Sequence, residues 1–231
     1  MFHISSCGVC GFLVTRPQPA QDEIMSFYPD ADYISHSSTA VTLTDYLFKI
    51  ARAFTLRWKQ TIISAHSQKG TLLDVGCGTG DFLFACKKSG WQITGVEPSM
   101  KAQKLAAQKT ASHIHTKLEE VSGHEFNVIT LWHVLEHLHD PNGTIQKLKT
   151  LLAQNGILVI ALPNYESFDA NKYNAYWAGF DVPRHLWHFS SSNFNKLAKN
   201  NGLNVVTTIP MKLDSYYVSL LSEKTNVEKT P

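Results

Sequence analysis

The spacing of apolar residues divides the chain into one long helical segment followed by alternating strands and helices. From Val41 to about Ser64, apolar side chains recur at helical spacing, which predicts a long amphipathic helix or a helix pair. Short apolar runs beyond it predict strands at 71–76, 91–96, 112–116, 126–132 and 155–162, and the segments between them predict helices at 81–89, 99–108 and 142–153. Such alternation is typical of βαβ units. We therefore expect an α/β fold of the Rossmann-like, doubly wound type, with a mainly parallel sheet and helices on both faces.

The two ends of the chain fit this pattern less well. Residues 1–40 are interpreted as an irregular N-terminal segment with a short helix near 22–27. A helix near 191–201 and a strand near 203–209 are predicted to complete a domain that spans 41–210. Residues 211–231 favour a helix over a seventh strand, so we interpret them as a C-terminal tail and leave open whether the chain is truncated there.

Composition narrows the class of protein. A chain of 231 residues suffices for one α/β domain with short additions. Its formal net charge of +2 gives no reason to expect a nucleic-acid or membrane partner. No run approaches about 18 apolar residues, and no signal peptide pattern opens the chain. Cys86 falls on a predicted helix and Cys77 just before it, which leaves only Cys7 and Cys10 as a pair, so we expect no disulfide framework. We expect a cytoplasmic protein of unknown oligomeric state, and the charge balance does not indicate a substrate.

The stretch Leu72–Gly80 is the strongest chemical signal. An apolar strand that contains Asp74 runs into three glycines at alternate positions: Gly76, Gly78 and Gly80. Glycines allow a sharp turn and let backbone N–H groups approach a ligand closely. A dinucleotide fingerprint would need glycine at Asp81, and the Gly-Lys-Ser/Thr ending of a phosphate loop is absent. Glu97 ends the next strand, where an acidic residue meets ribose hydroxyls. The pattern predicts a cofactor with a ribose but without phosphate.

This stretch, followed by Glu97, resembles the S-adenosylmethionine (SAM) site of class I methyltransferases. Three later segments are similar to the same family in the same order: Asn127–Pro141, Gly156–Asn164 and Asp181–Ser190. The last of them resembles the branch related to ubiquinone-biosynthesis O-methyltransferases (methyltransferase type 11/12/23-like). The resemblance covers about residues 40–210. It implies transfer of a methyl group from SAM to a small-molecule acceptor, by O-methylation, with S-adenosylhomocysteine as product; nitrogen and carbon acceptors stay open as alternatives.

The resemblance also implies roles for single residues around the cofactor. Asp74 and the three glycines would surround the methionine portion, and Glu97 would accept both ribose hydroxyls. The residues expected around the adenine are Met100, Leu118 and Glu119. Trp132 and His133 would close over the methionine end, and His133 is also a catalytic candidate. A turn-capping role for Asp74 and simple core packing for Trp132 remain open.

The segment 165–189 is rich in Tyr, Trp and His, which is unusual for a plain connection. We expect a lid or an acceptor pocket there. The predicted substrate-binding residues are Tyr173, Trp177, Arg184 and His188. His185 is the candidate base, since an unperturbed imidazole titrates near neutral pH, although a structural histidine is the alternative. Arg184 is also expected to brace the loop by pairing with a carboxylate.

Two motifs suggest metals. His133–His137 matches the H-x-x-E-H motif of inverted zinc peptidases, but a strand ends directly before it and Pro141 stops any helix soon after. Certain relatives carry a Glu-x-x-Glu-His version that binds a divalent ion, and His133 replaces its first ligand, so we expect no metal. Cys7 and Cys10 form half of a zinc ribbon, which needs four ligands. We interpret them as the vestige of such a ribbon.

Two other functions stay open. An RNA or protein methyltransferase would normally carry a basic surface or a recognition domain, and the near-neutral charge does not favour one. A SAM- or S-adenosylhomocysteine-binding protein without catalysis would show the same cofactor motifs.

Overall fold

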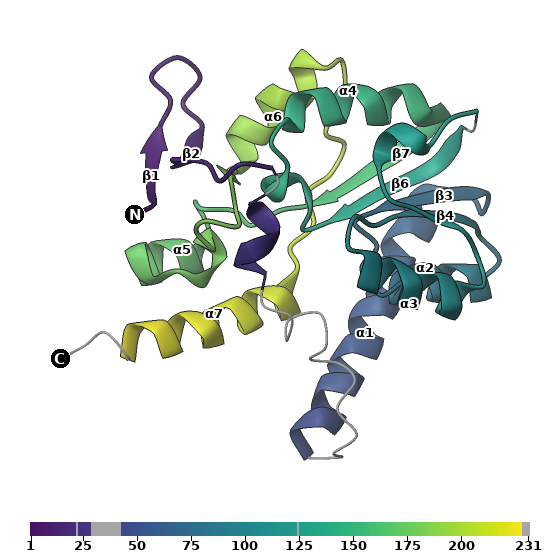
Figure 1. The fold of residues 1–231 in the computed structure, drawn as a ribbon, viewed down its shortest axis with the longest axis horizontal. Helices are drawn as coiled ribbons and strands as arrows, with labels where there is room; N and C mark the ends of the chain where they lie inside the picture. Colours follow the sequence, from purple (N-terminus) through teal and green to yellow (C-terminus); the bar gives the residue numbers. More distant parts are fainter. Residues whose placement is uncertain (22, 29–42, 124, 228–231) are drawn as a thin grey trace. The chain divides into compact units, whose positions relative to one another are not determined.

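The computed structural model describes residues 1–21, 23–28, 43–123 and 125–227. The chain divides into two compact units, which are described separately. The sheet unit comprises Asp30–Val134 and Gln146–Ala161, and the loop unit comprises Met1–Pro29, Leu135–Ile145 and Leu162–Pro231. Figure 1 labels the elements of both.

A five-stranded parallel sheet in the order β5-β4-β3-β6-β7 forms the centre of the sheet unit. Its strands are β3 Thr71–Val75, β4 Gln92–Val96, β5 Ile114–His115, β6 Phe126–Trp132 and β7 Leu152–Ala161. The central strand β3 pairs with β4 and β6, and Leu72 and Leu73 are fully buried. A parallel strand covered on both faces reads as a continuous apolar run, which is the pattern that predicted it.

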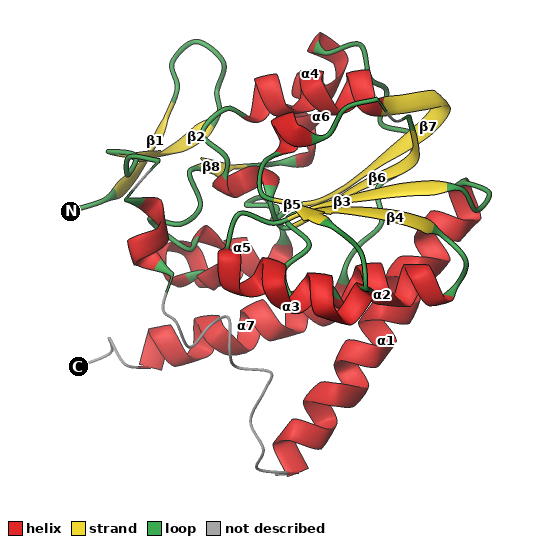
Figure 2. Ribbon diagram, turned by 45° about the vertical axis from the view of Figure 1, so that its right-hand side comes forward, coloured by secondary structure: helices red, strands yellow, loops and turns green. Residues whose placement is uncertain are grey.

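Helices cover this sheet on both faces, as Figures 1 and 2 show: α2 and α3 lie on one face and α4 on the other. The helices are α1 Leu43–His66, α2 Asp81–Lys88, α3 Met100–Thr110 and α4 Pro141–Leu151, with a short 3-10 helix η2 at Leu118–Glu120. Ile63 of α1 and Leu83 of α2 are fully buried in one core cluster with Leu72. The expected doubly wound α/β fold is therefore confirmed.

The loop unit contains a second, antiparallel sheet in the order β1-β2-β8. Its strands are β1 His3–Ser6, β2 Leu13–Arg16 and β8 Trp187–His188. The prediction that residues 1–40 are irregular is wrong for the β1–β2 hairpin. The sheet to which this hairpin belongs is completed by β8, which comes from a distant part of the chain. Residues 29–40 of that predicted segment lie outside the described residues.

The remaining elements of the loop unit are short, except for two helices. They are η1 Ile24–Phe27, η3 Leu135–His137, α5 Phe168–Tyr173, η4 Asn174–Tyr176, η5 Ala178–Phe180, α6 Ser191–Asn200 and α7 Lys212–Val227. The predicted strand at 203–209 is wrong: these residues carry no strand pairing, and Val206 is 83% exposed. Strand preference depends on a neighbouring strand and on burial, and this segment has neither among the described residues.

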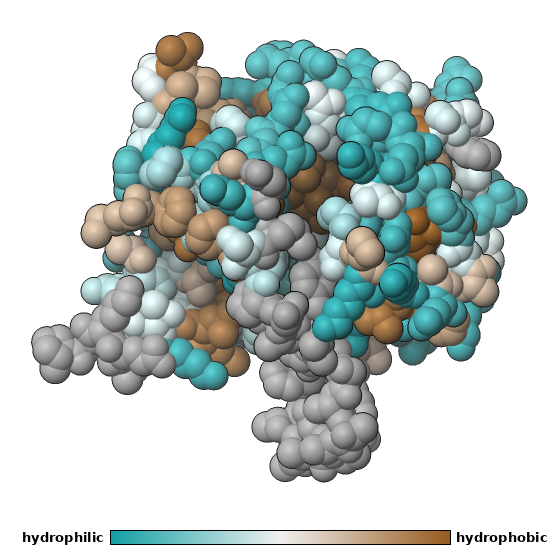
Figure 3. Space-filling model, in the orientation of Figure 1, coloured by the Kyte–Doolittle hydropathy of each residue, from teal (hydrophilic) through white to brown (hydrophobic). Residues whose placement is uncertain are grey.

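Helix α7 confirms the helix expected in the C-terminal tail. It packs on the 165–189 segment, since the Tyr173 hydroxyl donates to Glu223 Oε1 at 2.8 Å and the Ala178 N–H donates to Ser222 Oγ at 2.8 Å. Figure 3 shows hydrophobic residues gathered over α7, of which Leu220 is 65% exposed. None of the helices in the described part of the chain combines the length and the apolar character that crossing a membrane requires.

Candidate functional site

The glycine turn after β3 adopts the backbone conformation that its sequence predicts. Gly76, Gly78 and Gly80 have φ angles of +71°, +54° and +76°, a region that side chains disfavour. A Cβ on Gly76 would lie 2.5 Å from Val134 Cγ2, and one on Gly80 would lie 2.8 Å from Ala106 Cβ. No described atom lies within 4 Å of a Cβ placed on Gly78. Two of the glycines therefore permit close packing, and Gly78 borders open space.

The N–H groups of these glycines are used inside the protein. Gly76 donates to Val96 O at 2.8 Å, Gly78 to Glu97 Oε2 at 2.8 Å and Gly80 to Cys77 O at 3.0 Å. The expectation that these amides face a ligand is thus wrong. The turn offers a ligand space and not hydrogen-bond donors from its glycines.

Glu97 is buried beside this space, directly after β4. Its Oε2 accepts from Gly78 N–H, and its Oε1 accepts from Ser99 N–H at 2.9 Å. Burial raises the pKa of Glu97, and these two backbone hydrogen bonds oppose the rise. Each carboxylate oxygen has a second lone pair. The carboxylate is therefore oriented in advance and can still accept hydrogen bonds from a diol.

Asp74 is fully buried near the end of β3. It lies opposite Thr130 in the register with β6, and the Thr130 hydroxyl donates to Asp74 Oδ1 at 2.6 Å. Burial raises the pKa of Asp74 to about 7, although this hydrogen bond and the positive charge of Lys59 lower it. Asp74 thus changes charge near neutral pH, where a cationic ligand would favour the carboxylate.

Trp132 is the last residue of β6, and His133 follows it at the same edge of the sheet. The Trp132 ring meets Phe82 edge-on at 5.4 Å between centroids, and Lys59 Nζ lies 4.4 Å from its centroid. Trp132 Nε1 is buried without a hydrogen-bond partner among the described residues. His133 has a φ of +58°, and its N–H donates to Ala161 O at 3.2 Å. Packing and a ligand contact both remain compatible with Trp132.

The residues predicted around the adenine follow β4 and β5. Met100 begins α3 and is 67% exposed, whereas Leu118 and Glu119 lie on η2. Their contacts with a cofactor stay a prediction.

Sequence reasoning missed the ionic cluster at Asp81. Its carboxylate accepts from Arg52 of α1, from Lys109 of α3 at 2.8 Å and from the Thr79 hydroxyl at 2.8 Å. Burial alone would raise its pKa, but the hydrogen bonds from Lys109 and Thr79 hold the pKa below its usual range. One carboxylate therefore joins two helices to the glycine turn. The signal in the sequence was an acidic residue directly after the last glycine.

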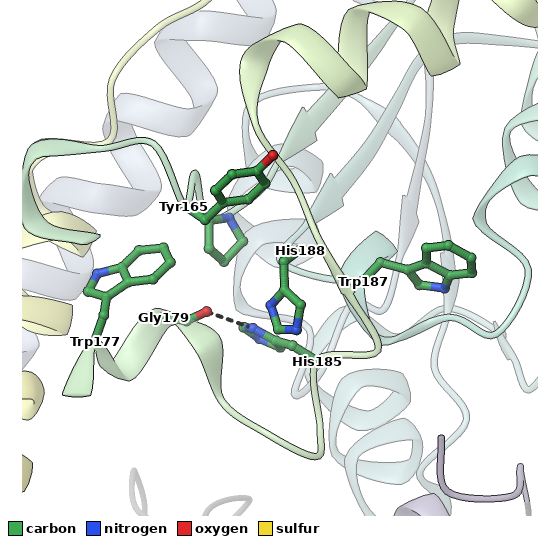
Figure 4. Close-up of a pocket in the computed structure, with 7 residues that line it drawn as sticks. Tyr165, Trp177, Gly179, His185, Trp187 and His188 are labelled. Carbon is green, nitrogen blue, oxygen red and sulfur yellow. Dashed lines mark hydrogen bonds between the residues drawn. The ribbon is translucent and has the colours of Figure 1, made fainter. Parts of the chain in front are cut away.

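In the loop unit, aromatic side chains surround a small hollow, drawn in Figure 4. It is lined by Pro163, Tyr165, Trp177, Gly179, His185, Trp187 and His188. These described side chains approach so closely that no water molecule fits between them. The structure brings Trp177, His185 and His188 together here, as the sequence predicted.

His185 differs from the expected neutral-pH base. Its Nδ1 lies 2.9 Å from Gly179 O, and its Nε2 lies 3.7 Å from Asp181 Oδ2. Burial lowers its pKa to about 4. The ring is therefore neutral at pH 7 and a weaker base than a free imidazole, and its catalytic role stays a prediction.

Tyr173 and Arg184 do not line the hollow. The Tyr173 hydroxyl is engaged by Glu223, as described above, and Arg184 donates to Asp181 Oδ1 from Nε at 3.0 Å and from Nη2 at 2.8 Å. The structure thus shows the predicted pairing that braces the loop. Substrate contacts of Tyr173 and Arg184 stay predictions.

One group of metal-ligating side chains is present within the described residues. Glu136, His137 and His185 each place a ligand atom within 4.8 Å of the others, and Glu136 is fully buried. His137 Nδ1 lies 3.0 Å from Arg184 O. This three-ligand cluster is not the H-x-x-E-H arrangement, because η3 is a single turn and His133 is not part of the cluster. It is a candidate metal site, and the sequence analysis, which expected no metal, did not identify it.

Cys7 and Cys10 lie in the turn of the β1–β2 hairpin. Hydrogen bonds from the backbone N–H groups of Cys10 and Val9 lower the pKa of Cys7. All four cysteines are free thiols. No third ligand joins this pair within the described ranges, and the interpretation of the pair as the vestige of a zinc ribbon stays a prediction.

Comparison with known proteins decides the family. The sequence model of a methyltransferase domain matches residues 46–208, which is more than half of the chain. The chain belongs to this methyltransferase family. It is 31% identical over 127 residues to the ubiquinone biosynthesis O-methyltransferase of Rhodopseudomonas palustris (strain HaA2), which covers 50% of each chain. It is 35% identical over 106 residues to the enzyme of the same name from Actinobacillus pleuropneumoniae serotype 7 (strain AP76), which covers 40% of this chain and 45% of the relative.

These matches are partial in length. The methyltransferase chain spans about half the length of the curated relatives it matches. Among solved structures, the magnesium protoporphyrin IX methyltransferase from Synechocystis PCC 6803 with bound SAH has a TM-score of 0.61 at 14% identity. That match covers 82% of this chain and 92% of the other. It supports the same fold, in agreement with the sheet order found here.

Proposed function

We propose that the protein is a SAM-dependent methyltransferase that transfers a methyl group to a small-molecule acceptor, at oxygen. The observation that carries the proposal is the Glu97 carboxylate, held by two backbone hydrogen bonds next to the open space at Gly78. A carboxylate that can accept hydrogen bonds from two neighbouring hydroxyls, beside a glycine that leaves space, fits the ribose of SAM. The family match and the names of its relatives support the reaction type.

The residues of the sheet unit would divide the cofactor between them. Glu97 would accept the ribose hydroxyls, and Asp74 as carboxylate would attract the ammonium group of the methionine portion. The adenine would lie among Met100, Leu118 and Glu119, and the methionine end beside Trp132 and His133. SAM supplies an activated methyl group on a sulfonium, so the chain has to hold the acceptor about 3–3.5 Å from it and in line.

The acceptor would bind in the loop unit, in the aromatic hollow. Its ring walls suit a flat or apolar molecule, and Trp177 and His188 are the predicted contacts that line it. The small net charge and the four free thiols support a cytoplasmic enzyme without a nucleic-acid partner.

One observation favours a second candidate. The hollow has no room for a water molecule, as a SAM- or S-adenosylhomocysteine-binding protein without catalysis would show. Transfer of radioactive methyl from SAM to any compound in an acceptor screen would exclude this candidate.

Calorimetric titration with SAM and S-adenosylhomocysteine tests the proposal. We expect micromolar binding, weakened about 10- to 150-fold by Glu97→Gln, since hydrogen bonds to a charged group contribute about 1.5–3 kcal/mol. Glu125→Gln is the matched control, because this carboxylate is exposed and is not among the predicted cofactor residues. An unchanged affinity of Glu97→Gln would exclude Glu97 as the ribose ligand, and no binding by the folded protein would refute the function.

A further inference from the structure

Thr15, on β2 of the N-terminal hairpin, contacts two residues of the 165–189 segment. Its side chain is fully buried. Its Oγ1 lies 2.6 Å from His185 O and 3.0 Å from His188 Nε2. β2 reaches this place because it pairs with β8, where Leu13 lies opposite His188.

The single hydroxyl hydrogen of Thr15 decides the tautomer of His188. A carbonyl oxygen can only accept, so the Thr15 hydroxyl donates to His185 O. Towards His188, Oγ1 must then act as the acceptor, and Nε2 carries the hydrogen. A neutral imidazole carries a single ring hydrogen, so a hydrogen on Nε2 leaves none on Nδ1. Its Nδ1 is left with a lone pair.

His188 lines the aromatic hollow, and its ring lies next to that of His185 (Figure 4). His185 has the opposite tautomer, because its Nδ1 faces Gly179 O and must donate to it. The lone pair of His185 is on Nε2, on the side of Asp181. The two histidines therefore offer their lone pairs from different ring atoms.

We propose that Thr15 is a positioning residue that holds His188 as its Nε2-protonated tautomer, so that His188 Nδ1 accepts a hydrogen bond from an O–H or N–H group of the methyl acceptor. This inference rests on the proposed function. An imidazole nitrogen that carries no hydrogen accepts a hydrogen bond from a donor group. The hairpin that the sequence interpretation treated as vestigial thereby belongs to the acceptor site. Since the hollow has no room for a water molecule, the acceptor has to displace one of the lining side chains.

The tautomer is measured first, on the full chain labelled with ¹⁵N-histidine. We expect the NMR spectrum to show His188 with the proton on Nε2 in the wild type and in Thr15→Ser, which keeps the hydroxyl. In Thr15→Val the Nε2–H loses its acceptor, and we expect a mixture of tautomers. A wild-type His188 with its proton on Nδ1, or a tautomer unaffected by Thr15→Val, would overturn the proposal. If Thr15→Val does not fold, the wild type and Thr15→Ser still decide it.

The acceptor role is tested with phenol and with anisole, which lacks the hydroxyl hydrogen. Phenol at millimolar concentration should shift the His188 Nδ1 signal, and anisole should not. His188→Gln can still donate to Thr15 but has no acceptor at the Nδ1 position, so it should weaken phenol binding about 2- to 10-fold. An Nδ1 signal that ignores phenol, or responds equally to anisole, would refute this role. Calorimetry with SAM on the same variants should give unchanged affinity, which keeps this outcome separate from the proposed function.

Discussion

Gly78→Ala is the sharpest test of the cofactor site, because a methyl group there meets no described protein atom within 4 Å. The change places a Cβ in the space that SAM would fill. At a φ of +54°, alanine costs about 1–2 kcal/mol of folding stability through backbone strain. Overlap with a tightly fitted ligand costs about 1–3 kcal/mol more in binding, which corresponds to an affinity loss of about 5- to 150-fold.

The assay is calorimetric titration with SAM, together with thermal unfolding of each variant. Gly123→Ala is the matched control: its φ is +70°, its Cβ also meets no described atom, and it lies in the loop before β6. Both variants should lose similar stability, and Gly78→Ala alone should lose affinity. Equal SAM affinities for the two variants would show that the space at Gly78 is not the cofactor site.

The other two glycines of the turn provide a contrast. Gly76→Ala would press against Val134, and Gly80→Ala against the backbone and Cβ of Ala106. These clashes are inside the protein, so we expect larger losses of stability, about 1–3 kcal/mol beyond the backbone strain. Unfolding temperatures equal to that of Gly78→Ala would contradict this packing.

Three further changes have defined outcomes. The pKa of Asp74 is about 7 in the folded chain and near 4 in the unfolded chain, so its contribution to stability falls by about 4 kcal/mol as the pH rises from 4 to 7. Urea unfolding should therefore show that the stability of the wild type falls relative to that of Asp74→Asn over this pH range. Free energies of unfolding that change in parallel with pH in the two proteins would contradict the shifted pKa. Asp81→Asn should lower the unfolding temperature at pH 7, and its difference from the wild type should shrink as falling pH protonates the native carboxylate; a difference that does not change with pH would contradict a role for its charge. One equivalent of Zn²⁺ should raise the unfolding temperature of a variant that lacks the Cys-x-x-Cys thiols. His185→Ala should abolish this rise, whereas the control His66→Ala, which changes an exposed histidine, should not. The absence of any rise would exclude the three-ligand cluster as a zinc site.

The sheet unit was largely predictable because its signals are local. Strands β3 and β6 are continuous apolar runs, and the helices between strands show their own period. The positive φ angles at Gly76 and Gly80 follow from residue type, and the Arg184–Asp181 pair joins residues three apart in sequence. Such features depend on near neighbours, which periodicity and residue type report directly.

The residues of the candidate site were predictable from the sequence, but their hydrogen-bond partners and pKa values were not. The sequence placed Glu97 and the glycines at one sheet edge, yet the amides of the glycines turned out to serve Val96, Glu97 and Cys77. It selected His185 for a near-neutral pKa that burial then lowers. Hydrogen-bond partners and burial are properties of the packed chain, so composition and spacing do not determine them.

By itself, the sequence determined the order of strands and helices in the sheet unit, the glycine turn and the methyltransferase family. Only the tertiary structure decided the hairpin partner β8, the absence of strand pairing at 203–209, the Thr15–His188 contact and the three-ligand cluster. The physical reason is separation along the chain. Thr15 and His188 are 173 residues apart. Strand pairing, the tautomer of a histidine and a set of metal ligands all depend on contacts with residues that are distant in sequence. Local sequence patterns do not determine which distant residues make these contacts.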